Sequence, residues 1–286
     1  MKLKLLLLAV AVVALSLFIQ SCGGDEDPVK NVLITSHRGT GQFYSIDVTT
    51  GVTTPIFSIS QTGTTLKDFR AFVYHPKQNK YFVSEATNSG GDLFSVDVES
   101  KSATLINDND GEIEWDAVVN WVVDTDDSLL SVGDFNGNDN AFVKFGVNGG
   151  RSGRDIEVAG ICCGFGMLYD SKAGIITLGN SNNADDGEVI IDRFTKAGVK
   201  QGSSILITTF NNFPEGSAMA TSWLTTKCLA QDGNGPIYGI VFNDDTDDSY
   251  LVEIDLTALT VTYISTLGID NSNQYNVLAF VPENKL

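Results

Sequence analysis

The sequence predicts an all-β protein made of five similar sheets, and two observations lead to this prediction. Five segments of the chain align with one another, and each reads as an apolar run, a loop rich in Asn, Asp, Gly and Ser, a second run, a turn and a third run. Similarity repeated at a period of roughly 50 residues is typical of repeat architectures. The second observation is that the two ends of the chain complement each other as strands of one sheet. The aligned segments cover residues 31–58, 80–107, 127–158, 173–205 and 235–265.

The second repeat, with the residues that precede it, shows the strands of one sheet most clearly. Residues 69–76 form an apolar strand that ends at Pro76, because proline cannot continue a hydrogen-bonded ladder. Three further strands follow at residues 80–85, 92–98 and 103–106, and the middle one alternates apolar and polar residues as a half-buried strand does. Four short strands at even spacing, joined by turn residues, describe one blade of a β-propeller.

The remaining repeats supply three more blades. Their first strands are expected within residues 115–123, 164–169 and 219–229, ahead of the aligned segments. The interval before the last repeat is the longest because it includes residues 208–222, which leaves room for an additional hairpin. The sequence therefore predicts a five-bladed β-propeller with four-stranded blades, and a six-bladed propeller or a β-sandwich is the alternative.

The ends of the chain indicate how the ring closes. The first repeat lacks a preceding strand, and residues 275–285 provide a strand without a sheet. This C-terminal segment matches residues 69–80, since both contain an apolar strand, a proline and then Asn-Lys. We therefore expect the C-terminal strand to complete the N-terminal blade, which leaves no free sheet edge at the closure. A sandwich would not explain this complementarity.

The N-terminus has the pattern of a secretory signal peptide. Lys2 and Lys4 precede an apolar run that extends from Leu5 to Ile19. This run is shorter than the about 20 apolar residues that cross a bilayer as a helix. The sequence therefore predicts a signal peptide over residues 1–21 rather than a transmembrane helix.

The residues around Cys22 resemble a bacterial lipobox, in which Ile-Gln-Ser precedes the cysteine. The resemblance implies that Cys22 is acylated and becomes the N-terminus of the mature chain. Residues 22–30 contain Gly, Pro and acidic residues and are predicted to form a flexible tether. The tether leads to a single β-propeller domain over residues 31–286.

The acidic cluster just after Cys22 resembles the surface-export signal of Bacteroidota lipoproteins. The resemblance implies an envelope lipoprotein that is anchored in the outer membrane and displayed on the cell surface. A plain polar linker would explain the same residues, so a periplasmic location stays open. Two or three acyl chains suffice for lasting attachment, whereas a single chain is marginal.

The chain is strongly acidic, with a formal net charge of −18. Loss of Lys2 and Lys4 with the signal peptide makes the mature chain more acidic still. Such a charge repels nucleic acid, which argues against a nucleic-acid partner, and it favours cations or basic partners. The solubility of a secreted protein would explain the same charge.

Three cysteines lie beyond Cys22, and these are Cys162, Cys163 and Cys228. They are too few for a disulfide scaffold and lack the spacing of a zinc site. Adjacent cysteines seldom bridge each other because their Cβ atoms diverge, and a bond from one of the pair to Cys228 stays open. We interpret all three as buried small residues.

One face of the propeller is predicted to be acidic and to carry the function. Loops between the second and third strands, and loops between blades, emerge on the same face, and most Asp and Asn clusters fall in them. Turn geometry explains the Asn and Gly residues, but it explains the crowded carboxylates of residues 244–248 less well. The residues expected to bind a glycan or an envelope protein are Arg70, Trp115, Phe210, Phe213 and Tyr275.

Two of these loops carry oxygen ligands of the kind that calcium prefers. Residues 134–139 resemble the calcium loop of integrin-type FG-GAP repeats, although Phe142 stands at the position of its final acidic ligand. Residues 107–112 match such a loop in part, and Ile106 stands where an EF-hand loop places its first ligand. Calcium is the one cofactor that these loops suggest, and its candidate ligands are Asp134, Asn136, Asn138, Asp108 and Asp110.

Catalysis is the alternative to binding, because some five-bladed propellers are glycosidases with paired carboxylates in the central channel. No catalytic motif of those enzymes is recognisable here, and the Asp that they place on an early inner strand is absent. His37 and His75 have no second His or Cys at ligand spacing and are interpreted as structural. The candidate carboxylates near the channel mouth are Asp68, Glu112, Glu114, Asp116 and Glu215.

The sequence thus predicts a lipid-anchored propeller that binds a glycan or a protein partner without catalysis. A propeller glycoside hydrolase or lyase and a structural subunit of a surface complex are the alternatives. Arg70 is expected to pair with Asp116 or Glu114, or to bind an anionic ligand group. Trp121 and Trp223 are expected to fill the core between blades, and the same role is the alternative for Trp115.

Overall fold

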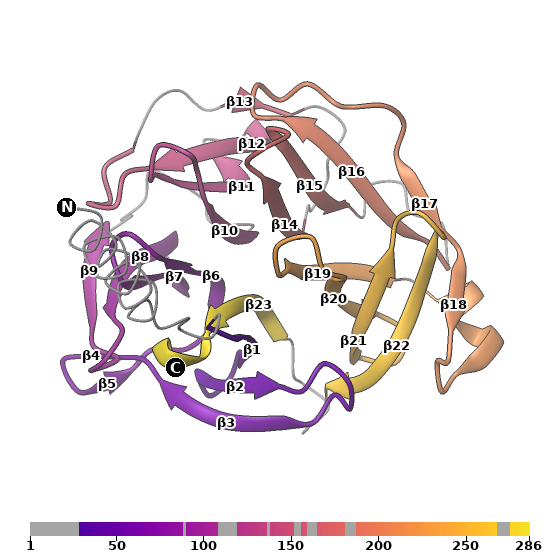
Figure 1. The fold of residues 1–286 in the computed structure, drawn as a ribbon, viewed down its shortest axis with the longest axis horizontal. Helices are drawn as coiled ribbons and strands as arrows, with labels where there is room; N and C mark the ends of the chain where they lie inside the picture. The colour runs from indigo at the N-terminus through magenta and orange to yellow at the C-terminus, as the bar shows by residue number, and fades with distance from the viewer. Residues whose placement is uncertain are drawn as a thin grey trace, which may run out of the picture. The chain divides into compact units, whose positions relative to one another are not determined.

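Five β-sheets surround a common centre in the computed structural model (Figure 1). Residues 31–286 form one unit, and this unit is an all-β, five-bladed β-propeller, so the predicted fold class is confirmed. Among the described residues, no helix is long and apolar enough to cross a lipid bilayer. The structure describes residues 29–87, 90–107, 119–135, 138–151, 156–158, 165–180, 187–222, 224–267 and 275–286.

Each blade has four strand positions, from the innermost strand at the centre of the ring to the outermost strand. Blades one to five are numbered in the order in which their second strands occur along the chain. The innermost strands, which contact one another around the ring, are β23 (Tyr275–Pro282), β6 (Phe69–His75), β10 (Val119–Val123), β14 (Phe165–Asp170) and β19 (Leu224–Gln231). The second strands are β1 (Asn31–His37), β7 (Lys80–Thr87), β11 (Leu129–Phe135), β15 (Ile175–Asn180) and β20 (Ile237–Asn243). The third strands are β2 (Gln42–Ile46), β8 (Gly90–Asp97), β12 (Asn138–Phe145), β16 (Val189–Thr195) and β21 (Asp248–Asp255). The outermost strands are β3 (Thr53–Ser58), β9 (Ala103–Asn107), β13 (Ile156–Glu157), β17 (Ile205–Ile207) and β22 (Thr260–Leu267).

The C-terminal strand closes the ring, as the sequence predicts. β23 pairs antiparallel with β1 from Asn31 opposite Pro282 to His37 opposite Tyr275, and Figure 1 shows the yellow strand beside the indigo one. Beyond β23, the short 3-10 helix η2 (Glu283–Lys285) extends the closure to blade two, where Tyr81 and Lys101 both donate to the carbonyl oxygen of Lys285. Two blades therefore hold the end of the chain.

The long interval before blade five adds structure at its outer edge rather than a sixth blade. β18 (Thr209–Asn211) pairs in parallel with β22 and becomes a fifth strand of that sheet. The 3-10 helix η1 (Gly216–Thr221) follows it, so the innermost strand β19 begins later than predicted. A small hairpin, β4 (Ser60–Gln61) with β5 (Thr64–Thr65), lies between blades one and two.

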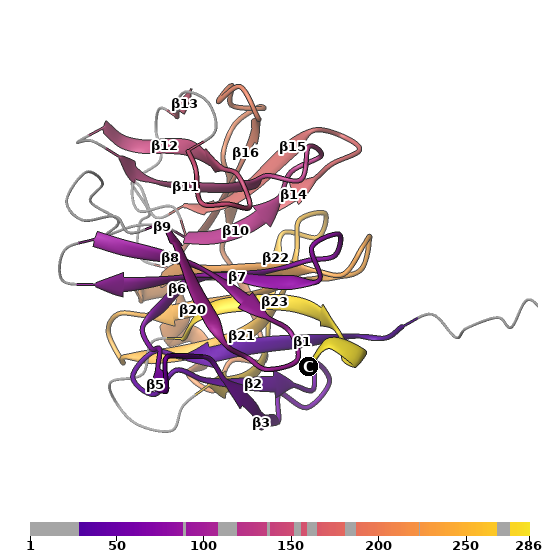
Figure 2. The ribbon, with the colours of Figure 1, turned by 90° about the vertical axis from the view of Figure 1, so that its left-hand side faces the viewer.

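Apolar side chains fill the space between neighbouring blades. Figure 2 shows the sheets of blades one, two and three as successive layers. Phe43 of blade one packs at ring-centre distances of 5.1 and 5.2 Å from Phe69 and Phe72 of blade two, and all three are buried. Trp121 is 2 % exposed and meets Phe145 edge to face at 5.6 Å, so it belongs to this core as predicted.

Polar contacts join the turns of blades two and three. His75 is fully buried, and its Nδ1 accepts a hydrogen bond of 3.3 Å from the Gln78 amide. The proton must then lie on Nε2, which donates to the carbonyl oxygen of Asp127 at 3.0 Å. Lys77 forms an ion pair of 2.8 Å with the side chain of the same Asp127. His75 therefore has a structural role, in agreement with its interpretation from the sequence.

A repeated turn is built on an aspartate. In blade five, Oδ1 of Asp255 accepts hydrogen bonds of 2.8 Å from the amides of Thr257 and Ala258. The next residue, Leu259, has a positive φ of 55°. The equivalent positions after Asp47 and Asp170 are Gly51 and Gly174, with φ of 69° and 68°. Glycine adopts this conformation without strain, whereas leucine does not.

Candidate functional site

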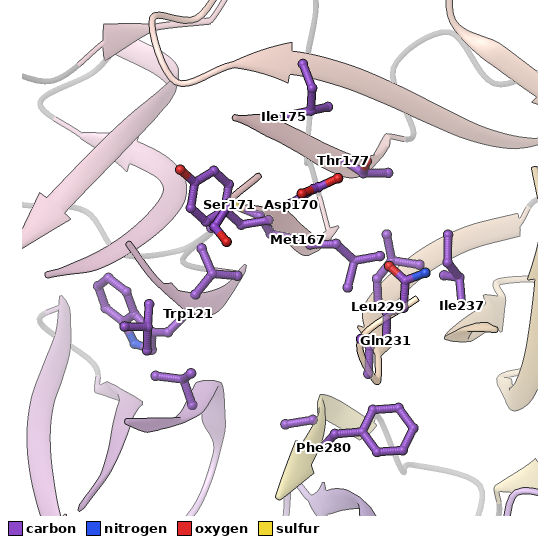
Figure 3. A pocket seen from close by; sticks show the side chains of 18 of the residues that line it. Trp121, Met167, Asp170, Ser171, Ile175, Thr177, Leu229, Gln231, Ile237 and Phe280 are labelled. Carbon is purple, nitrogen blue, oxygen red and sulfur yellow. The ribbon is translucent and has the colours of Figure 1, made fainter. Parts of the chain in front are cut away.

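A cavity of about 920 Å³ lies at the centre of the ring and is walled by all five innermost strands. Figure 3 shows Trp121, Met167, Leu229 and Phe280 around it, each from a different blade. The lining residues come from the C-terminal ends of these strands and from the turns that follow them toward each second strand. The cavity therefore opens on the face opposite to the loops in which the sequence predicted the function.

The cavity continues outward between blades four and five. Ile175 and Thr177 on β15 form one side, and Ile237 on β20 and Leu256 after β21 form the other. Figure 3 shows Ile175 and Thr177 apart from Ile237 across this space. The site thus has a central part and a lateral part with different walls.

Three partly exposed aromatic side chains line the cavity, and neighbouring groups hold each of them. The hydroxyl of Tyr74 donates to Oδ1 of Asn79 at 3.1 Å, and burial raises the pKa of Tyr74. The ammonium of Lys196 lies 5.6 Å from the ring centre of Tyr169. The ring of Phe280 meets that of Tyr238 at 6.0 Å. The rings are therefore positioned before any ligand arrives.

The buried carboxylate of Asp124 holds the ammonium group of Lys196 over the ring of Tyr169. The side chain of Asp124 is 2 % exposed and lies 2.7 Å from the Lys196 nitrogen and 2.9 Å from that of Lys144. Burial opposes ionisation of this carboxyl, but hydrogen bonds from Lys196 and Lys144 hold the pKa of Asp124 well below its usual range. Since Asp124 belongs to blade three and Lys196 to blade four, the pair also joins two blades.

Asp170 is the one carboxylate among the described residues that line the cavity. Its Oδ1 accepts hydrogen bonds of 2.9 and 3.0 Å from the amides of Lys172 and Ala173, so it shapes its own turn. The described part of the chain also contains no group of three His, Cys, Asp or Glu residues that could hold a metal. The described lining therefore offers neither paired carboxylates nor a metal centre.

The structure places Arg70 in an ion-pair cluster rather than in the cavity lining. Its Nε lies 3.5 Å from Oδ1 of Asp68, and the same oxygen lies 2.6 Å from Nε of Arg38. Asp68, which was expected near the channel mouth, directly precedes the innermost strand β6. The cluster joins the β1–β2 loop of blade one to β6 of blade two.

Phe210, Phe213 and Glu215 lie at the outer edge of blade five, away from the described cavity. Phe213 is 7 % exposed and meets the ring of Tyr250 edge to face at 5.5 Å. The hydroxyl of Tyr250 donates to Glu215 at 2.6 Å. Burial, together with this hydrogen bond, raises the pKa of Tyr250. These contacts attach the inserted segment to the blade.

Other sequence candidates fall in several places. Tyr275 lies in β23, Asp134 at the end of β11 and Asn138 at the start of β12. Cys228 is buried, which raises the pKa of its thiol. The candidates outside the described residues are Cys22, Asp108, Asp110, Glu112, Glu114, Trp115, Asp116, Asn136, Cys162, Cys163 and Trp223.

Tyr74, Tyr169 and Phe280 were not predicted from the sequence, although one signal of their position was present. Tyr74 and Phe280 occupy the same position, two residues before proline, in the two segments that match at the ring closure. An aromatic residue at the end of an innermost strand, beside a turn, faces the channel mouth. This position could have indicated the cavity from the sequence alone.

No family model matches the chain, and no curated protein is similar enough to count as a relative. Solved structures share its fold at low identity. A chain of a nidogen/laminin complex has a TM-score of 0.54 at 9 % identity, over 88 % of this chain and 98 % of that one. A putative TolB from Agrobacterium tumefaciens has a TM-score of 0.51 at 12 % identity, over 87 % and 90 %. An engineered GH43 glycoside hydrolase has a TM-score of 0.54 at 10 % identity, over 79 % of this chain and 49 % of that one. These likenesses show the β-propeller fold alone.

Proposed function

We propose that this protein is a non-catalytic binding protein that holds a glycan in its central cavity. The observation that carries the proposal is the set of positioned aromatic rings, Tyr74, Tyr169 and Phe280, around one cavity. A pyranose ring presents a face of C–H groups, which packs against an aromatic ring, and an edge of hydroxyl groups, which needs hydrogen bonds. The cavity offers both kinds of surface.

The polar residues of the lining supply the hydrogen bonds. Gln201, Gln231 and Asn234 carry amide groups and are exposed at the cavity. The side-chain nitrogens of Gln201 and Gln231 already donate to the carbonyl oxygens of Val199 and Gly235, so their side-chain oxygens are the groups offered to a ligand as acceptors. Polar groups of this kind beside apolar walls occur in small-ligand sites, whose volumes run from about 300 to 1,000 Å³. The volume of about 920 Å³ is therefore suited to a short oligosaccharide.

Hydrolysis of the glycan has less support than binding. Glycosidases need two carboxyl groups about 5–9.5 Å apart across the bond that breaks. The described lining contains only Asp170, whose oxygen is hydrogen-bonded within its own turn. The described lining residues therefore support binding better than hydrolysis, which would need a second carboxylate.

A glycan array followed by calorimetry tests the proposal. The purified domain should bind a subset of glycans, and Tyr169→Ala should weaken the tightest of them about tenfold or more, because a stacking surface is lost. Tyr44→Ala is the matched control, since Tyr44 lies on β2 outside the cavity lining. Absence of binding to any glycan, or equal loss in both variants, would contradict the proposal, and release of shortened glycans would indicate an enzyme instead.

We also propose that the domain acts at the bacterial cell envelope, tethered through a lipid on Cys22. The support is the lipobox-like Ile-Gln-Ser before Cys22 and the acidic tether after it. An anchored propeller would present its cavity to glycans near the outer membrane. Whether it faces the medium or the periplasm is answered by protease treatment of intact cells.

A further inference from the structure

We infer that the glycan is acidic and that its carboxylate binds Arg193 and Lys172, an inference that rests on the proposed function. Both side chains line the cavity and are exposed. In the described part of the chain, neither takes part in an ion pair. Several other described cations do have carboxylate partners, among them Arg38, Arg70, Lys77, Lys144, Lys196 and Lys200.

Lys172 and Arg193 place two positive charges at one cavity, although the chain as a whole has a net charge of −18. Asp170, the carboxylate of the described lining, accepts two amide hydrogen bonds within its turn. The lining therefore carries more positive than negative charge.

Strand pairing places Arg193 on the wall of the lateral part of the cavity. Arg193 on β16 lies directly opposite Thr177 on β15, and directly opposed residues project from the same face of a sheet. Lys172 belongs to the turn that leads into β15. The facing wall is apolar, with Ile237 and Leu256 from blade five. A ligand bound against this apolar wall would reduce the access of water to its contact with the cations, which strengthens that contact.

A carboxylate is the group that this arrangement recognises best. The guanidinium fork of arginine matches the two oxygens of a carboxylate in a bidentate contact. A uronic acid would place such a group beside a sugar ring, with the ring on Tyr169 and the carboxylate at Arg193. A neutral glycan would leave both cations without a partner. An acidic peptide would satisfy the cations, but it would make less use of the aromatic rings and amides.

The test compares oligosaccharides of uronic acids with the methyl esters of the same compounds. The esters keep the rings and remove the charge. An array that carries both forms identifies the oligosaccharide that the domain binds most tightly. Calorimetry then measures the affinity of the wild-type domain, Arg193→Gln and Lys172→Gln for this acid and for its methyl ester. Lys67→Gln is the matched control, because it removes an equal charge from an exposed side chain outside the cavity lining. Thermal unfolding confirms that each variant is folded.

We expect the acid to bind at least about tenfold more tightly than its ester, and Arg193→Gln to reduce acid binding to the level of the ester. Equal binding of acid and ester, or unchanged acid binding in both cavity variants, would overturn the inference. If neutral glycans bind and Tyr169→Ala weakens them, the proposed function survives and only the acidic ligand is lost. If no glycan binds, both fall, and binding of polyglutamate that depends on Arg193 would identify a peptide ligand instead.

Discussion

Lys196 in blade four donates a 2.7 Å hydrogen bond to the buried carboxylate of Asp124 in blade three. The same lysine lies over the ring of Tyr169 at the cavity. One side chain therefore connects the packing of two blades to an aromatic surface of the candidate site. A change at Asp124 should affect both stability and ligand binding.

We expect Asp124→Asn to lower the free energy of unfolding by about 2 kcal/mol, because it leaves two lysines without their buried partner. Asp126→Asn is the control, since the Asp126 side chain is 58 % exposed and pairs with Lys144 only at the surface. Its effect should stay below about 1 kcal/mol. Urea unfolding measures both. Equal effects of the two variants would show that the buried pair adds nothing.

The contribution of Asp124 should depend on pH in a defined direction. The pKa of Asp124 is lower in the folded protein than in the unfolded chain. Its stabilising effect is then fully present above the ordinary carboxyl pKa of about 4 and is lost as the pH falls toward the folded value. The difference in stability between the wild type and Asp124→Asn should shrink below pH of about 4. A difference that is constant from neutral to acid pH would exclude this origin.

Deletion of residues 275–286 should destabilise the whole domain, because it removes the innermost strand of blade one. A milder change is Val281→Ala, which opens a hole at a fully buried position and should cost about 2 kcal/mol. Val52→Ala is the control at a 60 % exposed valine and should change little. Unchanged thermal unfolding of the truncated chain would mean that the ring does not depend on its closure.

Leu259→Gly should stabilise the protein by about 0.5–1 kcal/mol, since glycine relieves the left-handed backbone at a side chain that is 44 % exposed. The converse change is Gly174→Ala in the equivalent turn of blade four. A Cβ there would meet no atom within 4 Å, so its cost, about 1 kcal/mol, comes from the backbone alone. Thermal unfolding of both variants tests the pair, and changes of the same sign would contradict the explanation.

Calcium binding at the loop that contains Asp134 and Asn138 stays a prediction. If the loop holds calcium, titration should release or absorb heat and raise the melting temperature of the domain, because the ion binds the folded state. Asp134→Ala should remove the response. No heat and no shift on the mature domain would end the hypothesis.

Attachment through Cys22 is tested in cells. Metabolic labelling with an alkyne fatty acid should mark the wild type and not Cys22→Ser, and only the wild type should remain with the membrane fraction. A labelled Cys22→Ser protein would contradict the lipobox interpretation.

The blade count and the ring closure could be predicted because local patterns determine them. Each blade repeats its own apolar runs and turns, and residues 275–285 carry the strand that the first repeat lacks. The segment before blade five could not be placed in this way. Its strand β18 pairs in parallel with β22, a contact between residues distant in sequence that no alternation pattern records. Phe213 therefore resembled a binding residue although it is buried against Tyr250.

The site itself was harder to predict because a channel-facing aromatic and a core aromatic look alike in sequence. Tyr74 and Phe72 are near neighbours on β6 and both line the cavity, yet Tyr74 is partly exposed there whereas Phe72 is 1 % exposed and packs into the core. Arg70 was expected to pair with Asp116 or Glu114, which lie outside the described residues, and one partner that the structure does show is Asp68, two residues before it. The positive φ of 51° at Asp68 turns the chain in a way that the sequence pattern does not reveal.

The pairing of β1 with β23 also determines when the first blade can be completed during synthesis. Thr35 donates a 2.7 Å hydrogen bond to the carbonyl oxygen of Val277, which lies 242 residues later. Contacts of such separation form slowly, because the loop between them must first be ordered. While the polypeptide is being synthesised, the first blade lacks its innermost strand until residues 275–282 have emerged. The first blade can thus be completed only after the residues that form the strands of the other four blades have been synthesised.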